Sequence, residues 1–600
     1  MDGAAAARFQ AAARLGMELM QARSMGARLD AIEAAEATQP GTCEAFLADA
    51  DEGRVMLNEL LKLLKVWGHH VRGEEAEREY YLCALRAADE RREVRRRLGL
   101  ERRWAAQRLV FLITVDCLRA DRLSCNGHDR PTSPAIDALA AEGVNFSRAY
   151  STANDTAQSF PSILLSNFFR NLGGGIVVPG HLTTLAEALR GNGFYTVGLN
   201  AANPMVSHYC GYDRGFDEFS DFFVSDEPDA AGRTPVRSLK RLKAVSEGAM
   251  RAVVAECEAR PDLYALLQRL TSLRGLELVR RIAGDKDMAG YYDAAEVVKA
   301  ALASLLACGH RRDIFCWMHL MDAHEPITVP FSRLGRFARV ERFFLNRCVQ
   351  SARAGDLRRV HGARYRELYD CAVSYVDLNV EVLRTFLEDH GLLGRSLVCL
   401  TGDHGQELLE DGAFGHGSRR VVEALLHVPL VFGGGLATRL DRAGAGRPVS
   451  SLDVAPTILD LCGVGEAPRS FLGTSLNDVR PRPAYVECMA VANPWDAQRN
   501  GFYLGLNGGA VLGGPRVIAC VEGHHILVHR IDTGETRLER SGGARGAPDE
   551  GEPPDGEEML RRTKAYFERI HVPAEGACVR QASAREKDVV VQRLKDLGYL

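Results

Sequence analysis

Acidic and imidazole side chains follow three short apolar runs of this sequence. The groups are Asp116 after LVFLITV, His319, Asp322 and His324 around the end of DIFCWM, and Asp403 with His404 after RSLVCLTG. A mixture of carboxylate oxygen and imidazole nitrogen suits a divalent cation such as Zn²⁺, Mn²⁺, Mg²⁺ or Ca²⁺ and disfavours a metal selected by thiolates. Such a cation lowers the pKa of a bound hydroxyl and neutralises charge on a phosphoryl or sulfuryl oxygen. The pattern therefore predicts a metal site for ester chemistry.

Each of these side chains, taken singly, also fits a structural role as a helix N-cap, a loop hydrogen-bonding group or a core histidine. Their shared place at strand ends favours the metal site. In open α/β sheets, ligands bind outside the carboxyl ends of the strands. We therefore expect groups that are far apart in the sequence to converge on one pocket.

A candidate nucleophile lies in the segment STANDTAQSFPSILLSNFF, residues 151 to 169. A serine and a proline lead into an apolar run with helical spacing, which predicts that Ser159 lies near a helix start. Free backbone N–H groups and the helix dipole favour an oxyanion there. Ser159 also fits an N-cap, and Thr156 is a rival nucleophile in the same loop.

The elements that must position these groups alternate between strand-like and helical patterns. Runs such as 109–116, 194–200, 313–322, 395–403 and 427–434 are short, apolar and rich in β-branched residues. They alternate with helical stretches such as 183–193 and 375–391. This alternation predicts an α/β fold with a mostly parallel central sheet flanked by helices.

Three further regions flank or interrupt this core. Residues 1–106 are rich in Ala, Leu, Glu and Arg and predict a helical N-terminal unit. We assign 107–480 to the catalytic domain, with a helical insertion at about 225–310 as the place to look for substrate selectivity, and 481–600 to a small C-terminal subdomain and tail. The basic segment 91–103 is interpreted as a solvated helix face.

The bulk composition is that of an ordinary globular protein, with 46% hydrophobic and 26% charged residues. The net charge of -4 gives no general attraction to nucleic acid or to an anionic membrane. The 15 cysteines form no C-x-x-C pair and predict buried, reduced thiols. Without a signal-like start or a run of about 18 apolar residues, we expect a cytoplasmic location and no membrane span.

Several motifs resemble the sulfatase-type members of the alkaline phosphatase superfamily. They occur in the family's order: VDCLRADRLSCNGHDRPTSPAIDALAAEGVNFSRAY (115–150), SFPSILLS (159–166), GFYTVGLNAANP and GYDRGFDEF (193–219), HLMDAHEP (319–326), TGDHGQELLEDGAFGHGS (401–418) and SSLDVAPTILDLCGV (450–464). The ending QRLKDLGYL (592–600) is similar as well. The resemblance implies the alkaline phosphatase/sulfatase-like fold over about residues 107 to 480.

The resemblance also implies roles for particular residues. It implies that Asp116, Asp403 and His404 hold a divalent metal, and that Ser159 is the nucleophile and also touches this metal. His324 and His416 would bind the transferring group or assist the leaving oxygen, with Asp322 nearby in substrate binding. In an alternative from the two-metal branches, Asp322, His324 and His416 surround a second cation.

Two departures from the sulfatase pattern bear on the chemistry. In the C/S-x-P-x-R motif, whose first residue becomes formylglycine in sulfatases, the Arg position is Ile163. Cys117 stands where many sulfatases have a second consecutive Asp ligand. An unmodified serine favours phosphoryl chemistry, so we expect a metal-dependent hydrolase of phosphate or sulfate esters that forms a covalent intermediate.

Other functions remain open from the sequence. They are a sulfatase proper, a phosphoryl-group transferase of the same fold, and an inactive scaffold or binding protein. The expected substrate is an ester of a small molecule, a glycan or a lipid headgroup, and no nucleic-acid partner is expected. A nucleic-acid binder working through residues 91–103 would show affinity that falls steeply with salt.

Overall fold

The computed structural model describes residues 108–173, 176–222, 293–308, 313–327, 362–417, 420–490, 513–541 and 554–570. Within these ranges no helix has both the length and the apolarity needed to cross a membrane. The predicted N-terminal unit, the basic segment 91–103 and the ending 592–600 lie outside the described residues. So does most of the predicted insertion. The predicted domain boundaries therefore stay predictions.

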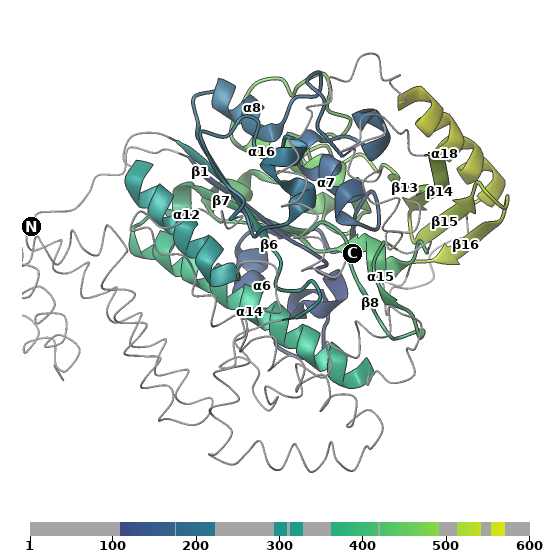
Figure 1. The fold of residues 1–600 in the computed structure, drawn as a ribbon, viewed down its shortest axis with the longest axis horizontal. Helices are drawn as coiled ribbons and strands as arrows, with labels where there is room; N and C mark the ends of the chain where they lie inside the picture. Colours follow the sequence, from purple (N-terminus) through teal and green to yellow (C-terminus); the bar gives the residue numbers. More distant parts are fainter. Residues whose placement is uncertain are drawn as a thin grey trace, which may run out of the picture. The chain divides into compact units, whose positions relative to one another are not determined.

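A largely parallel sheet forms the centre of the described fold (Figure 1). Among the described residues it has seven strands in the order β2-β11-β7-β1-β6-β4-β5. The strands are β1 (Leu109–Val115), β2 (Val144–Asn145), β4 (Tyr195–Asn200), β5 (Glu218–Ser220), β6 (Ile314–Leu320), β7 (Ser396–Gly402) and β11 (Leu430–Gly433). β1 runs parallel to β6 and β7, whereas β11 is antiparallel to β7 and β2. The predicted fold class is confirmed.

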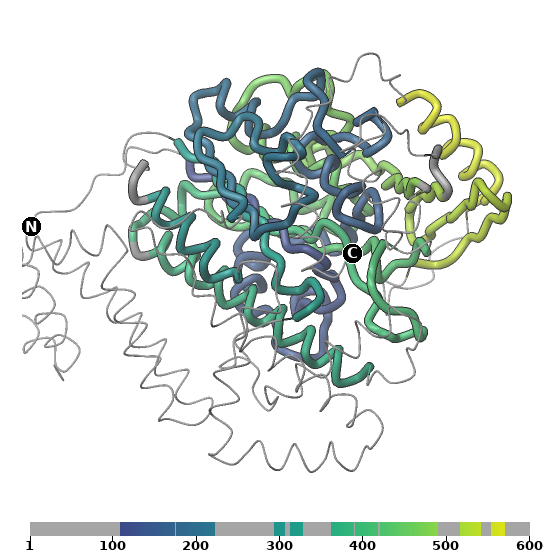
Figure 2. Tube along the Cα trace, viewed as in Figure 1, coloured from purple at the N-terminus to yellow at the C-terminus, as the bar shows by residue number. Residues whose placement is uncertain are grey.

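The apolar composition of the three central strands matches their position, because every residue of β1, β6 and β7 is buried. A strand covered on both faces needs a continuous apolar run and not an alternating one. Figure 2 shows these three strands side by side, although they come from three distant parts of the sequence.

Helices cover both faces of this sheet (Figure 1). They are α6 (Pro134–Glu142), α7 (Thr156–Leu165), α8 (Leu185–Gly191), α12 (Ala294–Cys308), α14 (Gly362–Asp389), α15 (Glu423–Leu426) and α16 (Val454–Leu461). α14 supplies a cap for α6, since the backbone N–H groups of Ala135 and Ile136 donate to the Asp377 carboxylate at 3.1 and 2.8 Å. These contacts satisfy donors that a helix start leaves without partners.

The predicted strand at 427–434 is instead two short strands. β10 (His427–Val428) pairs with β3 (Ala149–Tyr150) in a small sheet with β12 (Val449–Ser450), and only β11 joins the main sheet. Pro429 separates them, and a proline cannot donate a ladder hydrogen bond. A further pair, β8 (Glu407–Leu408) and β9 (Phe414–Gly415), forms a hairpin after β7.

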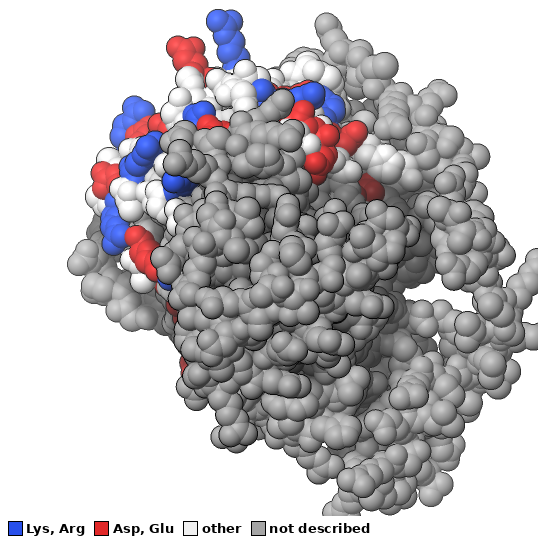
Figure 3. Space-filling model, turned by 90° about the vertical axis from the view of Figure 1, so that its left-hand side faces the viewer, with Lys and Arg blue, Asp and Glu red and all other residues white. Residues whose placement is uncertain are grey.

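A second, antiparallel sheet follows the main one along the chain. It contains β13 (Ala484–Ala490), β14 (Gly513–Glu522), β15 (His525–Arg530) and β16 (Thr536–Arg540), and α18 (Gly556–Ile570) packs on it through Phe567 and Ile570. The ion pair of Arg170 with the buried Glu487 joins this subdomain to the main fold. In Figure 3, positive and negative side chains lie interspersed among the described residues of the face in view.

Candidate active site at the carboxyl end of the sheet

The register of the central strands brings the predicted acids together. Val115, the last residue of β1, lies opposite Leu320 of β6 and Gly402 of β7. The residues that follow these strands therefore emerge at one edge of the sheet. Asp116 directly follows β1 and Asp403 directly follows β7, and both are fully buried.

Asp116, Asp403 and His404 form a compact group. His404 Nε2 lies 3.7 Å from Asp116 Oδ1 and 3.6 Å from Asp403 Oδ2. On the other side of the ring, His404 Nδ1 lies 2.8 Å from the carbonyl oxygen of Gly405. A proton on Nδ1 satisfies that contact and leaves the Nε2 lone pair directed at the two carboxylates. Such an outer hydrogen bond is the usual device that orients a metal-binding imidazole.

Charges within this group alter the pKa of each member. Burial opposes ionisation of Asp116, but the neighbouring imidazoles, His324 first, hold its pKa well below the usual value. Burial and then the charge of Asp116 raise the pKa of Asp403 to about 6. Burial disfavours protonation of His404, yet the two carboxylates outweigh it and raise its pKa. Two buried carboxylates so close together need positive charge beside them.

The donor set fits a divalent cation. Within the described part of the chain, the buried Oδ2 of Asp403 has no hydrogen-bond partner, although Asp403 Oδ1 accepts from the backbone N–H groups of Cys117 and His404. A buried carboxylate oxygen without a partner is costly. A cation bound between Asp116, Asp403 and His404 would remove that cost and the repulsion between the carboxylates.

Thr156, and not Ser159, is the hydroxyl that the structure brings to this group. Thr156 Oγ1 donates to Asp116 Oδ2 at 3.2 Å and lies 3.2 Å from His404 Nε2. Ser159 is fully buried, and within the described part of the chain its Oγ donates to the Thr156 carbonyl oxygen at 3.5 Å. The structure therefore does not place the predicted nucleophile Ser159 against the acids.

The start of α7 explains this difference. Asp155 is the N-cap: its Oδ1 accepts from the Gln158 backbone N–H at 3.0 Å, and its Oδ2 accepts from the Gln158 side chain. Thr156 is thus the first helical residue, and Ser159 lies almost one full turn further on. The spacing Asp155…Gln158 has the pattern of a capping box and was the sequence signal for the correct start.

Asn203, which the sequence did not single out, also contacts the group. The residue follows β4, and its Nδ2 donates to Asp116 Oδ2 at 2.9 Å and lies 3.2 Å from His319 Nε2. His319 Nδ1 lies 3.0 Å from Thr114 Oγ1, which also accepts from Trp317 Nε1 at 3.0 Å. His319 is therefore a member of a buried hydrogen-bond chain that ends on Asp116.

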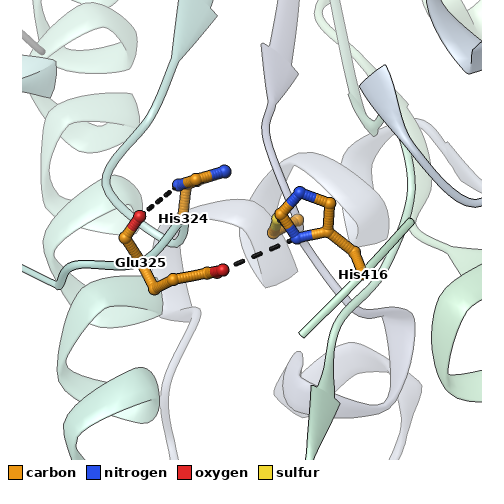
Figure 4. A group of neighbouring side chains, drawn as sticks. His324, Glu325 and His416 are labelled. Atoms are coloured by element: carbon orange, nitrogen blue, oxygen red, sulfur yellow. Dashed lines mark hydrogen bonds and ion pairs between the residues drawn. The ribbon is translucent and has the colours of Figure 1, made fainter. Parts of the chain in front are cut away.

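His324 and His416 lie close together, as Figure 4 shows. The His416 ring centroid lies 4.7 Å from that of His404 and 4.9 Å from that of His324. Glu325 accompanies them, with Oε2 3.8 Å from His416 Nδ1. Gln406 connects the two, because its Nε2 donates to Glu325 Oε2 at 2.6 Å and its Oε1 lies 2.9 Å from His416 Nδ1.

The described hydrogen bond of the Asp322 side chain goes to a different part of the fold from these imidazoles. Its Oδ1 accepts from the backbone N–H of Ala294 at 3.3 Å, at the start of α12. Burial and then the charge of Asp293 raise the pKa of Asp322 well above its usual value. No hydrogen bond joins Asp322 to His324 or His416 among the described contacts, so its role in substrate binding remains a prediction.

Comparison with known proteins places the chain in a family. A family model described as sulfatase matches residues 108–464. The chain belongs to the sulfatase family. The sequence-based identification of a sulfatase-type member of the alkaline phosphatase superfamily is therefore confirmed.

Two relatives of this sulfatase-family chain illustrate the match. A choline-sulfatase of Rhizobium meliloti (strain 1021) is 32% identical over 131 residues, a match that covers 22% of each chain. The solved structure of a phosphonate monoester hydrolase from Silicibacter pomeroyi is 18% identical, with a TM-score of 0.50 over 78% of this chain and 96% of that chain. The matched segment is thus about a fifth of the choline-sulfatase, and the solved structure supports the fold.

Proposed function

We propose that this chain is a metal-dependent enzyme that cleaves phosphate esters with Thr156 as an unmodified nucleophile. The observation that carries the proposal is the position of Thr156 Oγ1, 3.2 Å from Asp116 Oδ2 and 3.2 Å from His404 Nε2 at the N-terminus of α7. A hydroxyl beside metal-ligand candidates and a helix N-terminus is suited to attack on an anionic ester. The assignment replaces Ser159 as the predicted nucleophile.

The proposed metal ligands are Asp116, Asp403, His404 and Thr156 Oγ1. A bound cation would lower the pKa of the Thr156 hydroxyl and neutralise charge on the ester oxygens. The Thr156 oxygen then forms a bond to phosphorus as the bond to the alcohol oxygen breaks, and the alcohol leaves with a proton. Water releases the phosphoryl group from Thr156 in the second step. Contact of His324 and His416 with the transferring group stays a prediction.

The identity of the nucleophile favours phosphate over sulfatase chemistry. A formylglycine arises from a side chain with a primary Cβ, as in Cys or Ser. Threonine carries a methyl group on Cβ, so its oxidation would give a ketone and no aldehyde. Sulfate esters are the second candidate substrate, favoured by the similarity of 131 residues to a choline-sulfatase.

A panel of nitrophenyl esters tests this proposal. The esters are a phosphate monoester, a phosphate diester, a phosphonate monoester and a sulfate, offered to metal-stripped protein refilled with Mn²⁺, Zn²⁺, Mg²⁺ or Ca²⁺. We expect preferred turnover of a phosphoryl ester. Thr156→Ala should lose at least about 10³-fold in kcat, since removing a nucleophile is among the largest catalytic losses. Ser159→Ala is the matched control and should retain turnover within about tenfold.

Three results would count against the proposal, and a fourth would distinguish a transferase from a hydrolase. Turnover that survives Thr156→Ala but not Ser159→Ala would restore Ser159 as the nucleophile. Preferred sulfate turnover would favour the second candidate. An inactive protein with every ester and metal would favour a scaffold or binding role. Release of nitrophenol with transfer of the phosphoryl group to added glycerol would identify the transferase alternative.

A further inference from the structure

The outer edge of β13 lies against the segment that leads into α7. Among the described strands, β13 is an edge of the antiparallel sheet β13–β16, here called the C-terminal sheet. An edge strand presents backbone N–H groups that need partners. The N–H of Glu487 donates to the Thr152 carbonyl oxygen at 2.8 Å. Two residues further on, the N–H of Met489 donates to Gln158 Oε1 at 2.7 Å. Residues 152–158 therefore cover this edge.

The side-chain amide of Gln158 is held at both ends. Its Oε1 accepts from the Met489 N–H, and its Nε2 donates to Asp155 Oδ2. An ionised carboxylate can only accept and a backbone N–H can only donate, so a single orientation of the amide satisfies both neighbours. Gln158 is 2% exposed and Asp155 is 9% exposed, so an unmatched donor or acceptor here would be costly. This position therefore requires a side chain with one donor end and one acceptor end.

Asp155 links this amide to Thr156. Asp155 is the N-cap of α7 and directly precedes Thr156, and its Oδ1 accepts from the Gln158 backbone N–H at 3.0 Å. Asp155 and, through Gln158, β13 therefore hold the backbone of Thr156. Thr156 Oγ1 lies 3.2 Å from Asp116 Oδ2, at the long end of the range for a hydrogen bond. A movement of the helix start by about 1 Å would break that contact.

We propose that Gln158 is a positioning residue through which the C-terminal sheet holds the Thr156 hydroxyl against the acidic group. The described hydrogen bonds of the Gln158 side chain go to Asp155 and Met489, so it acts through the helix start and not on the substrate. The catalytic part of this inference rests on the proposed function, whereas the bridge between β13 and α7 does not. The C-terminal sheet thereby completes the geometry of the candidate active site.

Kinetics at saturating metal test the bridge from both ends. Gln158→Met keeps the side-chain length and removes both hydrogen bonds, so kcat should fall about 10- to 100-fold, as expected for a nucleophile misplaced by about 1 Å. KM should change little, because alignment of the nucleophile acts on the transition state. Met489→Pro removes the N–H at the other end and should lower kcat as well. Met489→Leu keeps that N–H and should be at least about tenfold more active than Met489→Pro.

A reversal of polarity tests whether the hydrogen bond itself matters. Gln158→Glu keeps an acceptor for the Met489 N–H but sets a carboxylate against Asp155, so kcat should fall as in Gln158→Met. Adding Asp155→Asn to Gln158→Glu restores the donor and acceptor pair in the opposite sense, and asparagine remains a good N-cap. The double variant should be at least about tenfold more active than Gln158→Glu alone, because residues in contact are not additive. A role in packing alone would give no such recovery.

Hydrogen exchange follows the bridge without any turnover. The peptide that contains residues 153–160 should exchange about fivefold faster or more in Gln158→Met than in the wild type. Arg537→Gln is the matched control, because Arg537 also joins the C-terminal sheet to the main fold, donating to the Val421 carbonyl oxygen at 2.6 Å, and is 41% exposed. This control should leave kcat and the exchange of the peptide within about twofold of the wild type. Circular dichroism of each variant verifies that it is folded.

The outcomes separate this inference from the proposed function. A folded Gln158→Met variant with the kcat of the wild type, or a double variant no more active than Gln158→Glu, would overturn the positioning role. A loss of kcat without faster exchange of the peptide would also overturn it, because the helix start would not have loosened. Faster exchange in a protein that cleaves no ester would support the bridge between β13 and α7 and overturn the proposed function instead.

Discussion

Asn203 Nδ2 and Thr156 Oγ1 both donate to a single atom, Asp116 Oδ2, at 2.9 and 3.2 Å. The carboxylate that ends β1 is therefore oriented from two sides, by a loop amide and by a helix N-terminus. The other oxygen, Asp116 Oδ1, faces Cys117 Sγ and His404 Nε2. Asp116 is thus the residue through which the proposed nucleophile, the proposed metal ligands and the buried hydrogen-bond chain are connected.

A covalent intermediate on Thr156 is the first expectation. Acid quenching during turnover of a phosphate ester should leave a phosphoryl group on the peptide that contains Thr156, and peptide mass spectrometry would locate it. Thr156→Ser keeps a hydroxyl at the helix start and should still form the adduct. An adduct on Ser159, or none in an enzyme that shows burst kinetics, would contradict the assignment.

Loss of the Asn203 amide should lower kcat and also cost about 1 kcal/mol of stability, because Asn203 Oδ1 accepts from the Met205 backbone N–H as a helix N-cap. Asn203→Ala leaves Asp116 Oδ2 with one donor fewer, and outer contacts of this type typically change metal affinity or activity by about 10- to 100-fold. Asn203→Asp should be more damaging, because it places a carboxylate against Asp116 Oδ2. Steady-state kinetics at saturating metal, compared with kinetics at limiting metal, separates weak metal binding from a slower step. Unchanged kinetics in both variants would exclude a positioning role for Asn203.

Removal of the metal should destabilise the wild-type fold. Without a cation, the buried Asp116 and Asp403 carboxylates repel each other, and bound metal adds about 2.7 kcal/mol at 100 times its Kd. A chelator should therefore lower the Tm of the wild type, and Asp403→Asn should respond much less. Asp129→Asn, at a carboxylate whose side chain is 87% exposed, should respond like the wild type. A wild-type Tm that the chelator leaves unchanged would argue against a cation at these carboxylates.

The free energy of unfolding should depend on pH through Asp377, which lies outside the candidate active site. Burial is the main cause that raises the pKa of Asp377 from 3.8 to about 7, and the N–H groups of Ile136 and Ala135 offset only part of it. A folded state that holds the proton more tightly loses stability as pH rises between the unfolded and folded pKa values. The expected loss is about 2 kcal/mol from pH 5 to pH 7.

Asp377→Asn removes this titration and keeps an acceptor for the start of α6. Its free energy of unfolding relative to the wild type should therefore improve as pH rises from 5 to 7, as measured by urea denaturation at each pH. Asp129→Asn again serves as the control, with a constant difference expected. A difference for Asp377→Asn that stays constant, or grows less favourable as pH rises, would contradict the raised pKa.

The sequence predicted the strand ends well because burial on both faces leaves a clear signal. The runs ending at Asp116 and Asp403 match β1 and β7 within one residue at either end. Once these two strands are known to be parallel neighbours, their register places the acids that follow them at the same edge of the sheet. The TGDHG motif and the order of the family motifs led to the same choice of acids as metal-ligand candidates.

Side chains that act across the fold were harder to predict. Asn203 and Glu325 are single polar residues in loops, and only the pairing of β4 with β6 brings Asn203 to Asp116. The serine in S-x-P drew attention to position 159, whereas the Asp155 cap fixes the helix start three residues earlier. A difference of three residues in a helix start determines which hydroxyl reaches the site.

Cys117 adopts a left-handed backbone with φ of 63°. A non-glycine residue in this conformation costs about 1 kcal/mol or more, and glycine would adopt it freely. Cys117→Gly would therefore relieve backbone strain and remove the thiol in the same step. The same exchange would empty the space that the fully buried Cys117 side chain fills and remove a donor to Asp116 Oδ1, so relief of backbone strain at this position is opposed by lost packing and a lost hydrogen bond beside the candidate active site.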